Sequence, residues 1–389
     1  MHAELIDRVR RRLAGSGAPL NPSAVAAAVR EESGGLVADA DLLAALRALQ
    51  QEFLGAGVLE PLLRDPRVTD VLVTAPDQVW VDRGDGLHRC SVTFPDDDGV
   101  RRLAQRLAVA TGRRLDEAQP WVDAWLPGAE AGEAVRLHAV LPPIAADGTC
   151  LSLRVLRPAS HDVGALRRLG TFDEECAAVL REIVRHRLAF LVTGGTGAGK
   201  TTLLAALLGE VHPTERIVCV EEAGELRPEH PHVVRLLTRP ANVEGAGEIR
   251  VRDLVRQALR MRPDRLIVGE VRGAEVCGLL AALNTGHDGG GGTVHANSPA
   301  EVPARLEALA ALGGLSRQAL HSQLAAAVQV VLHVRRATGG GRYLAAIGVL
   351  RRGHDLVRVV PAWDRDTGWG EGRADLLALL RARGGELPC

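Results

Sequence analysis

The pattern of apolar and polar positions divides the chain into regions with different periods. In residues 1–55, apolar residues recur every three or four positions, which predicts a helical segment. From 56 to 158, short β-rich runs alternate with turns and enclose one helix over 100–111. We therefore expect a small N-terminal α/β domain, followed by a linker over 159–175.

The second half of the chain alternates strand and helix more regularly. From 176 to 335, apolar strands are separated by helical segments, which is typical of a parallel sheet covered by helices on both faces. The rest, 336–389, has β-rich runs with glycine-rich turns and a final helix, and we expect an antiparallel appendage there. The predicted fold class is α/β, with a small N-terminal α/β domain before a larger domain built on a parallel sheet.

Composition matters chiefly through one residue. Lys200 is the only lysine among 47 basic residues, and it stands in a stretch that fits G-x-x-x-x-G-K-[ST] and consists of Gly194, Gly195, Thr196, Gly197, Ala198, Gly199, Lys200 and Thr201, with Thr202 next. A compact ammonium fits within a ring of backbone N–H groups where a planar guanidinium does not. The stretch predicts a loop that binds ATP, with the Thr201 hydroxyl directed at Mg²⁺.

Hydrolysis also needs a carboxylate at the tip of a neighbouring strand, to position water and hold hydrated Mg²⁺. Glu270 ends the apolar run 265–269, and Glu221, Glu222 and Glu225 follow the run 216–220. Each could instead be a helix cap or a surface charge. We expect Glu270 to act on water and metal, with Glu221 and Glu225 beside the nucleotide.

A histidine next to four consecutive glycines is the next candidate. His295 follows Gly289–Gly292, within a run we expect to contain a short strand over 293–296. Glycines have no side chains to hold them, so we expect this loop to move. His295 could bond the γ-phosphate and report its loss, or it could be an ordinary buried histidine.

These motifs together resemble a known family. Residues 60–335 are similar to the ATPases of the type II/type IV secretion superfamily, closest to the tight-adherence (CpaF-like) pilus-assembly and conjugal-transfer-associated ATPases. The resemblance rests on GGTGAGKTT, IVCVEEAGEL, HVVRLLTRPANVEGAGE, RDLVRQALRMRPDRLIVGEVRG and NTGHDGGGGTVHANS. The chain departs from the family at Glu222, where aspartate is usual. Gly290 and Gly291 replace a serine–leucine pair, so we expect a looser histidine loop.

The resemblance implies a RecA-like ATPase core and a hexameric ring, with ATP held between the two domains of each subunit. It implies that Glu221, Glu225, Glu270 and His295 surround the nucleotide. It also implies that arginines of the N-terminal domain close onto the phosphates, and Arg136 and Arg154 match best. The expected partner is an integral membrane platform protein of a pilus or secretion system.

The leading hypothesis is therefore a cytoplasmic ATPase that hydrolyses Mg-ATP to power pilus assembly or protein secretion. The N-terminus lacks a secretory signal, and we expect a location in the cytoplasm or at the inner face of the cytoplasmic membrane. One alternative is a RecA-like DNA translocase, although the net charge of −1 and 3% aromatic content lead us to expect no nucleic acid. Another is an ATP-gated assembly protein with weak turnover.

Overall fold

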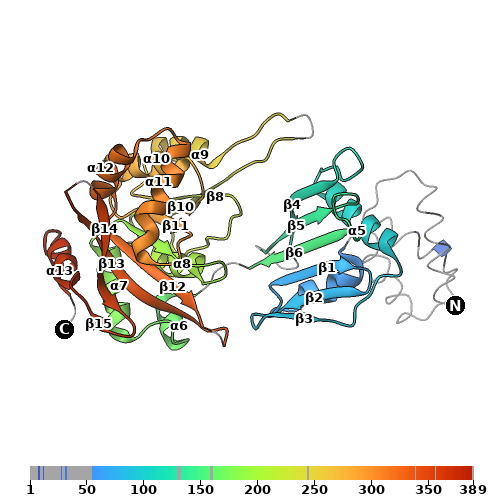
Figure 1. The fold of residues 1–389 in the computed structure, drawn as a ribbon, viewed down its shortest axis with the longest axis horizontal. Helices are drawn as coiled ribbons and strands as arrows, with labels where there is room; N and C mark the ends of the chain where they lie inside the picture. The colour runs from blue at the N-terminus through green and yellow to red at the C-terminus, as the bar shows by residue number, and fades with distance from the viewer. Residues whose placement is uncertain are drawn as a thin grey trace. The chain divides into compact units, whose positions relative to one another are not determined.

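The computed structural model forms two compact units, Met1–Arg157 and Pro158–Cys389 (Figure 1). The described residues are Arg8, Arg12, Ala28, Glu31, Glu32 and 55–389, without 129–132, 158–160, 243–244, 338, 355 and 388–389. The helical segment predicted over 1–55 thus lies almost entirely outside the described residues.

The first unit is built on a six-stranded antiparallel sheet in the order β3-β2-β1-β6-β5-β4. Its strands are β1 (Asp70–Ala75), β2 (Gln78–Asp82), β3 (Leu87–Arg89), β4 (Trp121–Pro127), β5 (Ala134–Val140) and β6 (Cys150–Leu156). Alternate side chains point to opposite faces, so Val71 and Leu153 are buried on one face. Apolar side chains of α5 (Asp97–Ala110) share this core, so the opposite face carries the polar positions.

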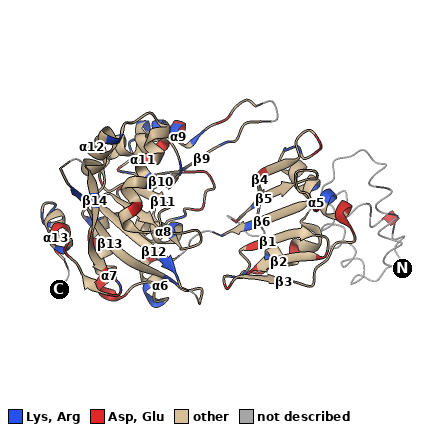
Figure 2. Cartoon of the chain, viewed as in Figure 1, with Lys and Arg blue, Asp and Glu red and all other residues tan. Residues whose placement is uncertain are grey.

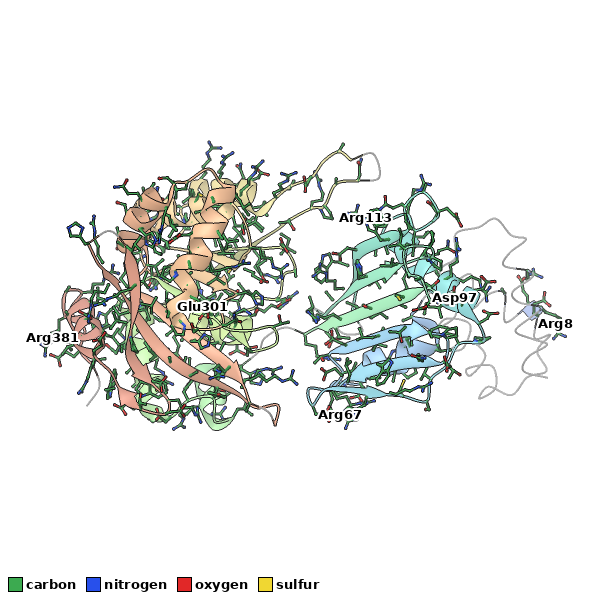
Figure 3. The ribbon with its side chains drawn as sticks, in the orientation of Figure 1. Arg8, Arg67, Asp97, Arg113, Glu301 and Arg381 are labelled. Atoms are coloured by element: carbon green, nitrogen blue, oxygen red, sulfur yellow. The ribbon has the colours of Figure 1, made fainter. Side chains whose placement is uncertain are left out.

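Side-chain contacts fix where α5 starts. The Asp96 carboxylate caps the helix by accepting a hydrogen bond from the Gly99 amide at 2.7 Å. Asp97, labelled in Figure 3, accepts hydrogen bonds from the amide and hydroxyl of buried Thr149 at 2.7 and 3.0 Å. These bonds tie the helix to the residue just before β6. The short helices η1 (Gly57–Leu59) and α4 (Glu60–Arg64) precede the sheet.

The second unit is built on a nine-stranded sheet in the order β15-β14-β13-β12-β7-β11-β10-β8-β9. Neighbours from β12 to β9 are parallel, and β13, β14 and β15 extend the sheet with antiparallel pairs. The strands are β7 (Phe190–Thr193), β8 (Ile217–Glu221), β9 (Val233–Leu237), β10 (Arg265–Val271), β11 (Gly291–Val294), β12 (Val330–Arg336), β13 (Arg342–Arg352), β14 (Val357–Asp364) and β15 (Gly368–Trp369). The α/β fold class expected from the sequence is confirmed.

Helices enclose this sheet through two separate apolar cores. One core holds residues of α6 (Val163–Arg168), α7 (Glu174–Arg185), α8 (Lys200–Gly209) and α13 (Arg373–Arg381). The other holds residues of α9 (Val251–Ala258), α10 (Glu275–Leu283), α11 (Val302–Leu312) and α12 (Arg317–Ala327). Short 3₁₀ turns, η2 (Leu259–Met261) and η3 (Pro299–Glu301), complete the unit. Figure 2 shows charged residues on the helices and loops and also on several strands, among them β12.

The predicted linker and the predicted C-terminal appendage both belong to one core of the second unit. The stretch proposed as a linker, 159–175, contains α6, and its Val163 and Leu166 are buried in a core of the second unit. The division between the units falls earlier, between Arg157 and Pro158. The antiparallel appendage shares the same core, because Leu376 and Leu380 of α13 are buried with strand residues of the parallel sheet.

The glycine run is not the mobile loop that we expected. Gly291 and Gly292 lie in β11, which pairs with β7 on one side and β10 on the other, and both are buried. A Cβ atom on Gly291 would lie 2.0 Å from the Phe190 carbonyl oxygen. A Cβ on Gly292 would lie 2.3 Å from the carbonyl oxygen of Val268. The glycines therefore allow a close approach of backbones at the centre of the sheet.

Candidate nucleotide-binding site

The loop between β7 and α8 carries the glycine–lysine motif. Gly194, Gly197 and Gly199 have φ values of 150°, 70° and 94°, which residues with a Cβ rarely adopt. These values let the chain bend sharply from the strand into the helix. The first helical turn also leaves backbone N–H groups without intrahelical partners, which favours an anion at this end.

Lys200 turns back into this loop from the first residue of α8. Its side chain is buried, and its Nζ donates to the carbonyl oxygens of Gly194 and Gly195 at 3.1 and 2.8 Å. Burial lowers the pKa of the ammonium, while the carboxylates of Glu270 and Glu225 act in the opposite direction. The loop thus encloses a cation, and an anion that entered it would meet that charge away from bulk water.

Glu270 on β10 lies within a cluster of charged side chains. Its carboxylate contacts His295 Nε2 at 2.8 Å through Oε1 and Arg272 Nη2 at 2.6 Å through Oε2. The same guanidinium contacts Glu222 at 2.9 Å through Nη1. Arg272 therefore bridges two of the candidate carboxylates and holds Glu270 beside the histidine.

His295 lies one residue beyond the end of β11, where we had expected it on a strand over 293–296. Both of its ring nitrogens lie 3.4 Å from Lys200 Nζ, so the histidine does reach the phosphate-loop lysine. Burial lowers the pKa of His295, and the Lys200 charge lowers it further. With its pKa lowered, the ring is neutral at pH 7, and its Nε2 lies beside the Glu270 carboxylate. The next turn is fixed by Glu301, labelled in Figure 3, which accepts a hydrogen bond from the Asn297 amide at 3.3 Å.

Glu221 ends β8 in a buried position. One carboxylate oxygen accepts a hydrogen bond from the Leu226 amide at 2.9 Å, and the other, Oε1, is buried without a partner among the described residues. Its side chain fills the space beside Gly269, where a Cβ atom would lie 2.7 Å from Glu221 Cγ. Glu221 thereby holds the turn that carries Glu225, and the catalytic roles of both residues stay predictions.

The burial of Glu221 leads to a prediction about pH. Burial raises its pKa from 4.5 to about 7, and the charge of Glu225 acts in the same direction. The folded chain then holds a proton that the unfolded chain releases above pH 4.5, so the free energy of unfolding falls from pH 4.5 to about 7 and then levels off. We expect Glu221→Gln to remove this fall, which is roughly 3 kcal/mol, as measured by denaturant unfolding at several pH values. Identical pH profiles for the two chains would contradict the assignment.

Arg136 and Arg154 lie on the first unit and are directly paired across β5 and β6. Each contacts an aspartate, Arg136 with Asp123 at 2.6 Å and Arg154 with Asp70 at 2.8 Å. The two arginines therefore form one charged patch on the polar face of the sheet. Their contact with a nucleotide stays a prediction.

Sequence reasoning missed other residues that shape the site. Arg272 is two residues beyond Glu270, a spacing that places both side chains on one side of an extended chain, and this signal was available. The Thr293 hydroxyl donates to the Gly269 carbonyl at 2.7 Å and locks β11 to β10. Buried His333 lies 2.9 Å from the Thr193 hydroxyl, at the base of the phosphate loop. Neither of these two contacts has a local sequence signal, because each joins distant strands.

No group of three or more His, Cys, Asp or Glu side chains could hold a metal ion within the part of the chain that the structure describes. In nucleotide sites, Mg²⁺ is usually held by one or two protein oxygens together with phosphate oxygens and water. The half-buried Thr201, in the first turn of α8, and Glu270 supply oxygen donors of the right kind. The donor set thus fits Mg²⁺ brought in with a nucleotide.

The parallel sheet, the glycine-bent loop and its enclosed lysine define the class of P-loop nucleotide-binding proteins. Within that class, the family model described as "Type II/IV secretion system protein" matches residues 52–339, and the chain belongs to this family. The family resemblance drawn from the sequence motifs is thereby confirmed. Among the described residues, no helix has both the length and the apolar character needed to cross a membrane.

Several known proteins are similar to this chain. A putative conjugal transfer protein of Mycobacterium tuberculosis is 65% identical over 349 residues, covering 90% of this chain and 99% of the relative. The type IV secretion system protein PtlH of Bordetella pertussis is 32% identical and covers 79% and 93%. The crystal structure of the pilus retraction motor PilT with bound ADP is 23% identical, with a TM-score of 0.52, and covers 74% and 80%. This last likeness supports the fold.

Proposed function

We propose that the chain is an ATP hydrolase that converts Mg-ATP hydrolysis into mechanical work for pilus assembly or protein secretion. The observation that carries the proposal is the position of Lys200, which is enclosed by the phosphate loop and lies 3.4 Å from His295. The Nε2 atom of His295 lies in turn 2.8 Å from Glu270 Oε1. A phosphate cradle and a carboxylate–histidine pair thus share one site. Family membership supports the secretion context.

The residues of the second unit have different roles in ATP binding and hydrolysis. The backbone N–H groups of the loop and the Lys200 ammonium bind the β- and γ-phosphates. Glu270 orients the attacking water and accepts its proton, and Arg272 keeps the carboxylate in place. The His295 ring is neutral at pH 7 and forms a hydrogen bond with the γ-phosphate. This hydrogen bond is lost when the γ-phosphate leaves. Glu225 adds negative charge near Lys200.

Mg²⁺ would be held by the Thr201 hydroxyl and, through water, by Glu270. When bound, it neutralises charge on the transferred phosphoryl group. The remaining contribution of the protein is to place Thr201 in the first turn of α8 and Glu270 near the end of β10.

At the level of the assembly, we propose a hexameric ring in the cytoplasm that docks on an integral membrane platform protein. Arg136 and Arg154 of the first unit would close onto the phosphates and release them after hydrolysis, which turns each ATP cycle into movement of one unit against the other. The ring, the location and the platform partner all rest on the family resemblance.

A second candidate is favoured by one observation. The relative that is 65% identical is called a putative conjugal transfer protein, and conjugal transfer moves DNA. A DNA translocase would use the same ATP site but would need a basic surface along the nucleic acid. The net charge of −1 argues against such a surface on the chain as a whole.

Phosphate release by the purified full-length chain tests these proposals. We expect turnover that requires both ATP and Mg²⁺ and that single- or double-stranded DNA leaves unchanged at moderate salt. Stimulation by DNA of fivefold or more would favour the translocase. Release of one phosphate per site without further turnover would favour an ATP-gated assembly protein. Absence of both binding and turnover would remove the proposal.

A further inference from the structure

The turn between β12 and β13 lies behind the phosphate loop. Strand β12 pairs with β7 up to the register pair His333 and Thr193, and it continues to Arg336 after β7 has ended. At this point a Cβ atom on Gly194 would lie 2.3 Å from the Val334 carbonyl oxygen. The end of β12 therefore forms a wall against which the first glycine of the loop is packed.

Arg342, the first residue of β13, reaches two further glycines of the loop. Its Nε donates to the Gly197 carbonyl oxygen at 3.0 Å. Its Cδ would lie 2.9 Å from a Cβ atom on Gly199, so the aliphatic stem occupies the space that this glycine leaves open. Arg336, which is paired with Arg342 across the two strands, is also close to Gly197, with Nη1 3.9 Å from its Cβ position.

The bond to Gly197 fixes the direction of one peptide group. A peptide is planar, so its C=O and its N–H point in opposite directions. With the Gly197 oxygen turned toward Arg342, the Ala198 N–H points the other way, toward the Gly195 carbonyl at 3.4 Å. That carbonyl is also a partner of Lys200 Nζ. Arg342 thus keeps a backbone donor directed at the interior of the loop, where the lysine lies.

The charge of Arg342 also remains near the loop. Among the described residues, no carboxylate forms an ion pair with Arg342, and its guanidinium is exposed. The positive charge of this guanidinium stabilises an anion bound inside the loop, and dissolved salt weakens this electrostatic effect. Both the bond and the charge thus act in favour of a bound phosphate group.

We propose that Arg342 is a positioning residue of the nucleotide site, which orients the Gly197–Ala198 peptide for phosphate from a strand far along the chain. The inference rests on the proposed nucleotide site, and it adds a residue outside the G-x-x-x-x-G-K-T motif. It also gives the C-terminal extension of the sheet a direct contact with the phosphate loop. A movement of the phosphate loop on nucleotide binding would therefore be transmitted to β13 through Arg342.

Three variants of the full-length chain separate the parts of this contact. Arg342→Met keeps the stem beside Gly199 and removes the N–H donor and the charge, whereas Arg342→Ala removes the stem as well. Arg358→Met, at an exposed arginine on β14, is the matched control. Amide hydrogen exchange of residues 195–200 in the nucleotide-free chain and the Kd for Mg-ADP are measured for all of them.

We expect Arg342→Met to raise amide exchange in the loop and to weaken Mg-ADP binding by about tenfold, as the loss of one charged hydrogen bond predicts. The kcat at saturating ATP should change less than KM, and the control should match the parent chain. Parent-like exchange and affinity in Arg342→Met would overturn the proposal, even if Arg342→Ala were impaired. If the parent chain itself binds no Mg-ADP, the proposed function fails, while the exchange measurement still tests the contact.

Discussion

Replacement of Lys200 by alanine is expected to weaken ATP binding by at least about a hundredfold. Lys200 is buried in the phosphate loop, and its ammonium is held by the Gly194 and Gly195 carbonyls. Removal of this charge leaves the backbone donors of the loop without the cation that the loop encloses. Calorimetric titration with a nonhydrolysable ATP analogue and Mg²⁺ measures the change, and far-UV circular dichroism verifies that the variant is folded.

Lys200→Arg is the sharper comparison, because the chain uses arginine at its other 46 basic positions. The guanidinium keeps the charge but is wider and planar, and it must fit where the lysine is only 8% exposed. We expect this variant to lose at least tenfold in affinity as well. Parent-like binding by Lys200→Arg would show that charge alone is required and that the shape of the loop is not selective.

The sequence predicted those parts of the site whose structure depends on residues that are close together in the chain. The loop around Lys200 is specified by consecutive residues, and Glu270 ends an apolar run that is visible without any partner strand. The parallel order of the strands followed from the alternation of strand and helix. His295 was placed near the phosphate loop by family resemblance, and the structure locates it at 3.4 Å from Lys200.

The parts that were missed depend on pairing between distant segments. Gly291 and Gly292 look like a flexible linker in the sequence, but they form a central strand because the backbones of β7 and β10 approach too closely for side chains. Strand β9 is only partly buried and has little apolar alternation, so it was not predicted. Arg342 and Gly197 are 145 residues apart, and nothing local to either one indicates the contact.

Replacement of Glu270 by glutamine is expected to reduce kcat by about a thousandfold while ATP affinity stays within threefold of the parent value. Glutamine has nearly the same shape but cannot accept a proton from water, so the loss falls on the chemical step. A change that removed binding instead would raise Kd. Single-turnover phosphate release and equilibrium binding of ATP, measured on the same preparation, separate the two effects.

Glu222→Gln supplies the matched control for this prediction. Both carboxylates contact Arg272, at 2.9 Å for Glu222 and 2.6 Å for Glu270, but only Glu270 contacts His295. If the carboxylates served only to anchor Arg272, the two substitutions would reduce turnover alike. We expect Glu222→Gln to retain at least a third of the parent kcat. Near-parent turnover in Glu270→Gln would transfer the role of the water-orienting group to Glu225, the other half-buried carboxylate whose charge acts on Lys200, and Glu225→Gln would then show the large loss.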